Sequence, residues 1–198
     1  MPASSDDRRA IVEEMFPELA EIEDDELREG VIQVWVTAME ENPNADPRTM
    51  PWGAYHDDIH DELQLDHVRQ VTQHAISIAD TMLLHRPDLD LNPDVVVAAG
   101  LLHDVSKLYE MTGTGKEFSE IGKLIPHPVM VNYLFHTHGI PVALQRIVLA
   151  HTHQTAVQPR TIEGQIIKLA DILALEALSW EHRGRPHNII ESTHYPHP

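Results

Sequence analysis

The sequence predicts an all-α protein. Apolar residues recur at spacings of three and four along most of the chain, and no stretch alternates apolar and polar residues as a half-buried strand would. Proline, glycine and asparagine fall between these periodic stretches, where helices begin or end. Hydrophobic residues make up 42% of the 198 residues, which is enough for one domain with a sizeable core.

Two N-terminal helices are expected to serve as packing elements. The first covers residues 6–15, and the second begins at the acidic turn Asp24-Asp25-Glu26 and ends before Asn42-Pro43. Neither helix carries a set of side chains that could form a ligand cluster.

A loop is expected over residues 42–56, because prolines and a glycine interrupt any helical period there. Within this loop, Trp52 and Tyr55 are expected to pin the segment to the body of the protein, with a part in a lid as the alternative. A long helix follows from Asp61 to His85. His67 and His74 both lie near its apolar stripe, and His74 is expected to be structural.

A central helix is predicted over residues 93–110, with Asn92 as its N-cap and Pro93 at its first position. The apolar run of this helix leads directly into His103-Asp104. Adjacent helical positions lie about 100° apart, so both side chains reach one ion only if it lies over the surface between them. Lys107 follows one turn later and suits an anionic substrate, unless it is an ordinary surface lysine.

Three further residues stand out in the C-terminal half. His127 lies between two prolines where a helix begins, and histidine is not a favoured capping residue. His151 follows the apolar stretch of a helix that begins at Pro141. Asp171 lies inside a nearly all-apolar helix that begins near Thr161, and a carboxylate there is unfavourable unless it is paired or binds a metal.

Composition narrows the classes of function. The formal net charge of −18 argues against binding to a nucleic-acid polymer, and no apolar run is long enough to span a membrane. The N-terminus lacks the pattern of a secretory signal, so we expect a cytoplasmic protein. Because there is no cysteine, any metal must be held by histidine, aspartate or glutamate. The acidic composition fits either adaptation to high salt or an ordinary solvated surface.

Six candidate ligands are separated by steps of about one helix plus one loop, which lets equivalent helix ends meet in an antiparallel array. Imidazole and carboxylate ligands without thiolate suit Fe, Mn, Co, Ni or Zn. The six are His67, His103, Asp104, His127, His151 and Asp171.

The order His … His-Asp … Asp resembles the HD-domain superfamily of metal-dependent phosphohydrolases, from about His67 to Leu178. The stretches Leu101-Leu-His-Asp-Val-Ser-Lys107 and Ile167-Lys-Leu-Ala-Asp171 are similar to it locally. The resemblance implies an HD-domain-like helical bundle with an N-terminal helical extension. It divides the chain into N-terminal helices and a loop packing on the core (1–56), the metal-binding domain (57–184) and an irregular tail (185–198).

The resemblance also implies roles for the six residues. His67, His103, Asp104 and Asp171 would hold a first divalent ion. His127 and His151 resemble the two additional histidines of the dinuclear branch, in which Asp104 would bridge two ions. The alternative is a mononuclear site in which His127 and His151 bind substrate phosphate.

The expected function is hydrolysis of a phosphate monoester or diester, such as a nucleotide or another small anionic ester, by metal-activated water. Asp104 would orient the water or bridge the ions, and Lys107 would contact the substrate. A cyclic di-GMP substrate is disfavoured, because His151 and His153 are not adjacent and the Gly-Tyr-Pro signature is absent. The alternatives are an HD-type di-iron oxygenase acting on a polyol or phosphonate, and a non-catalytic nucleotide-sensing HD module. The sequence carries no signal for an oligomeric state.

Overall fold

The computed structural model describes residues 4–52, 62–113 and 117–187. Across these ranges the chain forms helices and two isolated β-bridges without a strand, which confirms the all-α prediction. None of the described helices has the length and apolar character needed to cross a membrane. The helices are α1 (Ser5–Met15), η1 (Pro17–Glu21), α2 (Asp25–Glu41), α3 (Gln64–His85), α4 (Pro93–Leu102), α5 (Lys107–Glu110), α6 (His127–Met130), α7 (Asn132–Thr137), α8 (Val142–Ala150) and α9 (Ile162–Arg183).

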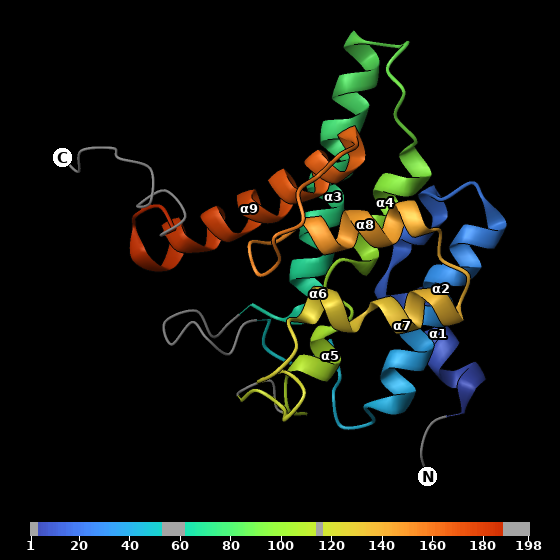
Figure 1. The fold of residues 1–198 in the computed structure, drawn as a ribbon, viewed down its shortest axis with the longest axis vertical. Coiled ribbons are helices and arrows are strands. Elements are labelled where there is room, and N and C mark those ends of the chain that lie inside the picture. The colour runs from blue at the N-terminus through green and yellow to red at the C-terminus, as the bar shows by residue number, and fades with distance from the viewer. Residues whose placement is uncertain (1–3, 53–61, 114–116, 188–198) are drawn as a thin grey trace.

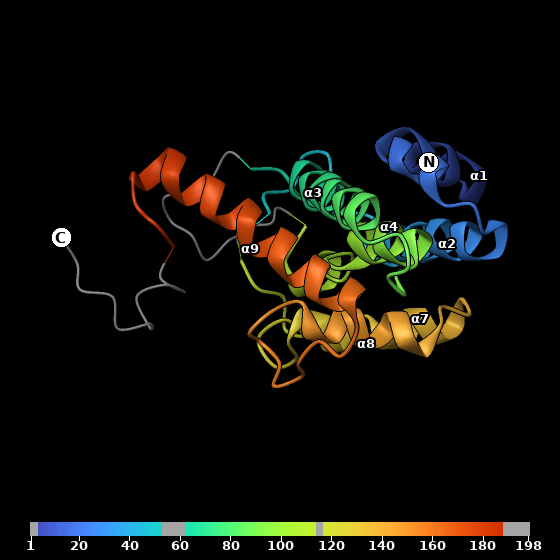
Figure 2. The same ribbon diagram turned by 90° about the horizontal axis from the view of Figure 1, so that it is seen from above.

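The short apolar helix α4 lies at the centre of the fold. It contacts α2, α3, α8 and α9, and Figure 2 shows α2 and α8 on different sides of it. Asn92 caps α4 by accepting hydrogen bonds from the backbone N–H groups of Asp94 and Val95, and Pro93 occupies the first turn, as the sequence predicts. Every residue from Val96 to Leu102 is buried, so α4 carries the chain through the core and delivers its C-terminal end to the site.

Helices α3 and α4 approach each other closely at Gly100. A Cβ atom at this position would lie 2.8 Å from Thr72 Oγ1 and 3.0 Å from Thr72 Cα. Only glycine leaves room for this contact. The close approach sets the first turn of α3, with His67, beside the end of α4, with His103.

The N-terminal helices support the same end of α4. Trp35 of α2 is fully buried, and its indole N–H donates to the carbonyl oxygen of Leu101 at 2.9 Å. Its ring packs against Phe16, with the ring centroids 4.9 Å apart. The extension therefore reaches the backbone two residues before His103. The division of the chain into three parts stays a prediction.

The expectation of one continuous helix from residue 93 to residue 110 is wrong. Helix α4 ends at Leu102, residues 103–106 form a turn, and α5 begins at Lys107. The backbone here is wound more tightly than an α-helix, because Lys107 N–H donates to the carbonyl of Asp104 three residues back. Because residues 103–106 are not regular α-helix, His103 and Asp104 need not point as neighbours on one helix would.

Smaller differences concern helix boundaries. The helix expected from Asp61 begins at Gln64, and residue 61 itself lies outside the described residues, as do Tyr55 and most of the C-terminal tail. The helix expected after His127 is split into α6 and α7. Helix α9 agrees with the sequence: Thr161 Oγ1 accepts from the N–H of Gly164, and Gly184 ends the helix with a φ of 61°.

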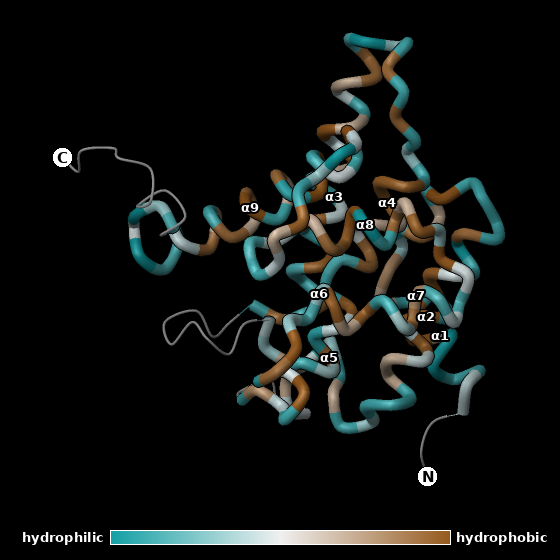
Figure 3. The backbone as a smooth tube through the Cα atoms, viewed as in Figure 1, coloured by the Kyte–Doolittle hydropathy of each residue, from teal (hydrophilic) through white to brown (hydrophobic). Residues whose placement is uncertain are grey.

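The outline of the molecule is uneven. The C-terminal half of α9 extends beyond the body of the protein, as does the turn between α3 and α4 (Figure 1). In Figure 3 this turn is mostly hydrophilic, whereas the segment labelled α4 is largely hydrophobic. Asp171 lies in the first half of α9, where this helix packs against α3, α4 and α8.

Candidate metal centre

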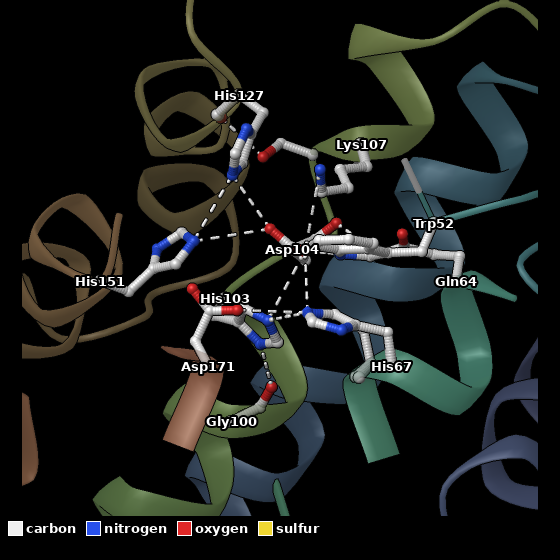
Figure 4. Close-up of polar contacts among 12 residues, drawn as sticks. Trp52, Gln64, His67, Gly100, His103, Asp104, Lys107, His127, His151 and Asp171 are labelled. Carbon is white, nitrogen blue, oxygen red and sulfur yellow. Dashed lines mark hydrogen bonds and ion pairs between the residues drawn. The ribbon is translucent and has the colours of Figure 1, made fainter. Parts of the chain in front are cut away.

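The structure brings the six candidate ligands together in two adjoining groups (Figure 4). The first group consists of His67, His103 and Asp171, and the second consists of Asp104, His127 and His151. Within each group, one possible ligand atom per residue lies within 4.8 Å of the other two. Their role as ligands stays a prediction, but their convergence from five separate helices and turns is a property of the fold.

The first group is carried by long elements. His67 lies in the first turn of α3, His103 directly follows α4, and Asp171 lies within α9. His67 Nε2 is 3.3 Å from Asp171 Oδ1 and 3.4 Å from His103 Nε2. Both imidazoles are fully buried, whereas the Asp171 side chain is 18% exposed and reaches the cavity described below.

The second group is carried by shorter elements. His127 is the first residue of α6, His151 directly follows α8, and Asp104 lies in the turn between α4 and α5. Nε2 of His127 and Nε2 of His151 face each other at 3.4 Å. Asp104 Oδ1 lies 3.0 Å from His127 Nε2 and 3.5 Å from His151 Nε2.

Asp104 connects the two groups through its two oxygens. Oδ1 faces the second group, whereas Oδ2 lies 3.6 Å from Nε2 of both His67 and His103. Oδ1 accepts no hydrogen bond of good geometry although it is buried. A buried carboxylate oxygen without a donor is unfavourable unless a cation completes its surroundings. This geometry fits one carboxylate shared between two ions.

Two of the histidines are held in a tautomer that suits a metal ligand. His103 Nδ1 lies 2.7 Å from the carbonyl oxygen of Gly100, and His151 Nδ1 lies 2.6 Å from that of Val148. A carbonyl can only accept, so Nδ1 carries the proton and Nε2 keeps its lone pair. Both carbonyls belong to the last turn of a helix, where the regular bonding to the N–H four residues on runs out and the oxygen can accept from a side chain. This arrangement of the outer nitrogen is typical of metal-binding histidines.

Burial and charge set the protonation of the site. Burial lowers the pKa of His103 to about 4, so its ring is neutral at neutral pH. Burial alone would raise the pKa of the Asp104 carboxyl, but Lys107 and the neighbouring imidazoles outweigh it and hold that pKa well below its usual range. For the Asp171 carboxyl, burial is outweighed by the hydrogen bond to His67, which lowers its pKa.

Lys107 is a buried residue of the site and not a surface lysine. Its ammonium lies 4.0 Å from Asp104 Oδ2 and 3.7 Å from Glu110 Oε2, and the residue is 2% exposed. Glu110 also lies 3.3 Å, through Oε1, from His127 Nδ1. Burial opposes a charge on Glu110, but the hydrogen bond from His127 and the charge of Lys107 lower its pKa.

Sequence reasoning missed three residues of the site. Trp52 was expected to pack or to form a lid, but its indole N–H donates to Asp104 Oδ2 at 2.9 Å. Gln64 Nε2 donates to the backbone oxygen of Asp104 at 3.0 Å. Glu110 had one available signal, because it follows Lys107 by three residues on one helical face. No comparable spacing pattern in the sequence indicates that Trp52 and Gln64 lie at the site.

Other histidines lie elsewhere. His74 is half-buried on α3, His136 is exposed on α7, and His138 contacts Thr37 Oγ1 through Nε2 at 2.9 Å. His74 is expected to be structural, and it lies outside both ligand groups. His153 is exposed and lines the cavity beside the site.

A cavity of about 490 Å³ opens onto both groups. The side chains of Ile172 and Leu175 on α9 and the ring of Trp52 form apolar parts of its wall. The polar side chains of the wall outside the two groups belong to Lys107, Thr152, His153, Gln154, Lys168 and His187. The arrangement combines a carboxylate that faces both groups, buried imidazoles and a buried lysine beside a space large enough for a small molecule.

Comparison with known proteins agrees with this geometry. A family model described as the HD domain matches residues 65–176, which is more than half of the chain. The chain belongs to the HD-domain family. All six candidate ligands lie within the matched residues of this HD domain, and the family is one of metal-dependent phosphohydrolases. No curated protein and no solved structure matches the chain.

The residues present fit the divalent ions that an HD domain implies. The fit rests on the buried Asp104 Oδ1, which accepts no hydrogen bond of good geometry, and on the inward-facing Nε2 atoms of His103 and His151. Four imidazoles and two carboxylates form a donor set without sulfur, which suits borderline divalent transition metals. The metal-binding character expected from the sequence is therefore supported by both the fold and the family.

Proposed function

We propose that this protein hydrolyses a small phosphate ester with two divalent ions held by its two ligand groups. The observation that carries the proposal is the Asp104 carboxylate, whose two oxygens face different groups of histidines. Such a carboxylate could bind two cations together, and paired cations are suited to in-line displacement at phosphorus. Iron, manganese, cobalt, nickel and zinc all suit this donor set.

The first group would hold one ion through His67, His103, Asp171 and Asp104, and the second would hold another through Asp104, His127 and His151. When bound, the ions supply a more acidic water and neutralise charge on the phosphoryl oxygens. The chain itself keeps the ligands in place, because helix-end carbonyls fix the rings of His103 and His151. These two rings therefore do not have to reorient before the ions bind.

Lys107 would provide a fixed positive charge for the phosphoryl group. Lys107 lines the cavity, and the contacts of its ammonium with Asp104 and Glu110 hold it in position. In a buried site a fixed cation stabilises developing negative charge more strongly than in water, because little solvent screens it. We therefore assign to Lys107 binding and orientation of the anion, and to Asp104 orientation of the attacking water.

The cavity favours an ester with an apolar or planar organic group. Ile172 and Leu175 project from α9 into the same space as the ligand groups, and the Trp52 ring lies nearby. An aromatic or heterocyclic group, such as a nucleobase, would bury apolar surface against this wall while its phosphate meets the ions. We propose nucleotides and aryl phosphates as the first esters to test.

The proposal is tested by counting metals and measuring hydrolysis on the same preparation. The protein is purified without a histidine tag or chelator under nitrogen, and its metals are counted by mass spectrometry. Phosphate release is then measured with nucleotides, cyclic phosphates and phenyl phosphate after loading with Mn²⁺, Co²⁺, Ni²⁺ or Zn²⁺. We expect about two ions per chain and hydrolysis of at least one ester.

The controls separate the rival functions. Asp104→Asn should abolish hydrolysis, whereas His136→Ala, which changes an exposed histidine of α7, should leave it unchanged. Two irons per chain with oxygen consumption on a polyol or phosphonate, and no phosphate release, would support the di-iron oxygenase instead. Failure to take up metal would contradict the enzyme itself and favour a non-catalytic module.

A further inference from the structure

Trp52 makes three contacts with three different residues of the site. Its indole N–H donates to Asp104 Oδ2 at 2.9 Å, and its ring stacks on His67 with the ring centroids 4.3 Å apart. The ammonium of Lys107 lies 5.1 Å from the ring centroid. Trp52 is 6% exposed and precedes the residues matched by the HD-domain family.

The backbone holds Trp52 firmly in this position. Pro51 and Leu63 form an antiparallel bridge, in which Trp52 N–H donates to the carbonyl of Glu62 and Gln64 N–H to that of Met50, both at 2.9 Å. The same bridge therefore carries two donors to Asp104. The Trp52 indole reaches its Oδ2, and the Gln64 side chain reaches its backbone oxygen at 3.0 Å.

The hydrogen bond from Trp52 restricts rotation of the Asp104 carboxylate. With Oδ2 held by the indole, Oδ1 faces His127 and His151 at 3.0 and 3.5 Å (Figure 4). Without the indole donor, the nearest fixed charge to Oδ2 is the ammonium of Lys107 at 4.0 Å. A rotation toward that charge would move Oδ1 away from the two histidines.

We propose that Trp52 is a positioning residue that turns Asp104 toward the second group and so makes the second metal site competent. This inference rests on the proposed function, because it presupposes ions at both groups. The first group keeps three candidate ligands of its own, His67, His103 and the Asp171 carboxylate, which this rotation does not move. The second group has no carboxylate except Asp104, so the loss of the indole N–H acts mainly on the second ion.

The test is a calorimetric titration of metal-free protein with Zn²⁺, in the wild type, Trp52→Phe and Trp180→Phe. Phenylalanine keeps an aromatic ring against His67 but removes the N–H. We expect the second Zn²⁺ to bind about 10- to 100-fold more weakly to Trp52→Phe, with the first step changed by less than about 3-fold. Trp180 is 58% exposed on α9, so the same substitution there should change neither step.

A measurement on the wild-type chain tests the inference even if the Trp52→Phe variant does not fold. The chain has three tryptophans, whose indole N–H signals can be assigned in a ¹⁵N-labelled sample through their backbone resonances. We expect the Trp52 N–H to exchange slowly with D₂O and to move when Zn²⁺ is added. The Trp35 N–H, bonded to the Leu101 carbonyl, should exchange slowly and stay in place, and that of Trp180 should exchange fast.

The outcomes distinguish this inference from the proposed function. If the wild type binds no Zn²⁺, both are overturned. If the wild type binds two ions and folded Trp52→Phe binds the second equally well, only the role of Trp52 is overturned. The role of Trp52 is also overturned if its N–H signal does not shift when Zn²⁺ is added, or if this N–H exchanges with D₂O as fast as that of Trp180.

Discussion

The two ligand groups share a chemistry but differ in how the chain builds them. The first group lies on α3, on α9 and at the end of α4, three helices that pack directly against one another. The second lies on a turn, on the four-residue α6 and at the end of α8. The first has a carboxylate of its own, whereas the second depends on Asp104. We therefore expect the first group to bind its ion more tightly and the second to control activity.

The largest loss of activity is expected for Asp104→Asn, because the Asp104 carboxylate faces both ligand groups. The amide keeps the shape of the side chain but cannot bridge two cations. We expect kcat/KM for the best ester to fall about 1,000-fold and bound Zn²⁺ to fall from two ions per chain toward one. Steady-state kinetics and metal counting check this. Two tightly bound ions in the variant would show that Asp104 does not bridge.

A direct contrast of the two groups comes from His67→Ala and His127→Ala. We expect His127→Ala to lose the second ion alone and about 100-fold in kcat/KM. His67→Ala should weaken the first, tighter binding step. Metal counting and Zn²⁺ titration of both variants provide the readout, with His136→Ala as the control. If the wild type held one ion that His127→Ala left in place, His127 and His151 would be substrate-binding residues.

The scaffold of the first group can be tested at Gly100. An alanine there would press its methyl against Thr72, so α3 and α4 would have to separate. We expect Gly100→Ala to lower the free energy of unfolding by about 1–3 kcal/mol. Urea denaturation measures this. Gly164→Ala is the matched control, since its Cβ would meet neighbours only at 3.5 Å or more, and a change below about 1 kcal/mol is expected.

The smallest loss of metal affinity is expected at Glu110, which contacts the outer nitrogen, Nδ1, of His127 in the second group. Glu110→Gln keeps an acceptor for His127 Nδ1 but removes the negative charge. We expect the second Zn²⁺ step to weaken about 10-fold and the first to stay unchanged. Glu120→Gln is the control, because Glu120 also pairs with a lysine three residues away but its side chain is 91% exposed. Equal behaviour of the two variants would exclude a role for Glu110.

The sequence predicts which side chains come together better than it predicts the backbone and the contacts that connect them. The helix signals at Asn92 and Thr161 are local, and the structure has both as N-caps. Asp171 could be singled out because a carboxylate in an apolar helix needs a partner. The six residues follow one another in the order of the helices. The resemblance to HD domains made it possible to interpret that order as a single site.

The missed features all depend on contacts between distant segments. Trp52 and Asp104 are 52 residues apart, and no periodic pattern relates an indole in a loop to a carboxylate in a turn. The break after Leu102 was missed because the apolar run continues through Val105 and Leu108, both buried. Residues packed on several sides look alike in sequence whether their backbone is a helix or a tight turn.

The bridge between Pro51 and Leu63 affects which part of the chain must stay together when the domain is transferred between genes. All six candidate ligands lie within residues 65–176, but Trp52, Gln64 and the core residue Trp35 precede that range. A recombination event that moved only residues 65–176 into another gene would transfer every candidate ligand and none of these three side chains. The recipient would need its own donors for Asp104 and for the carbonyl oxygen of Leu101. The segment that carries the ligands is therefore shorter than the segment that must be inherited together.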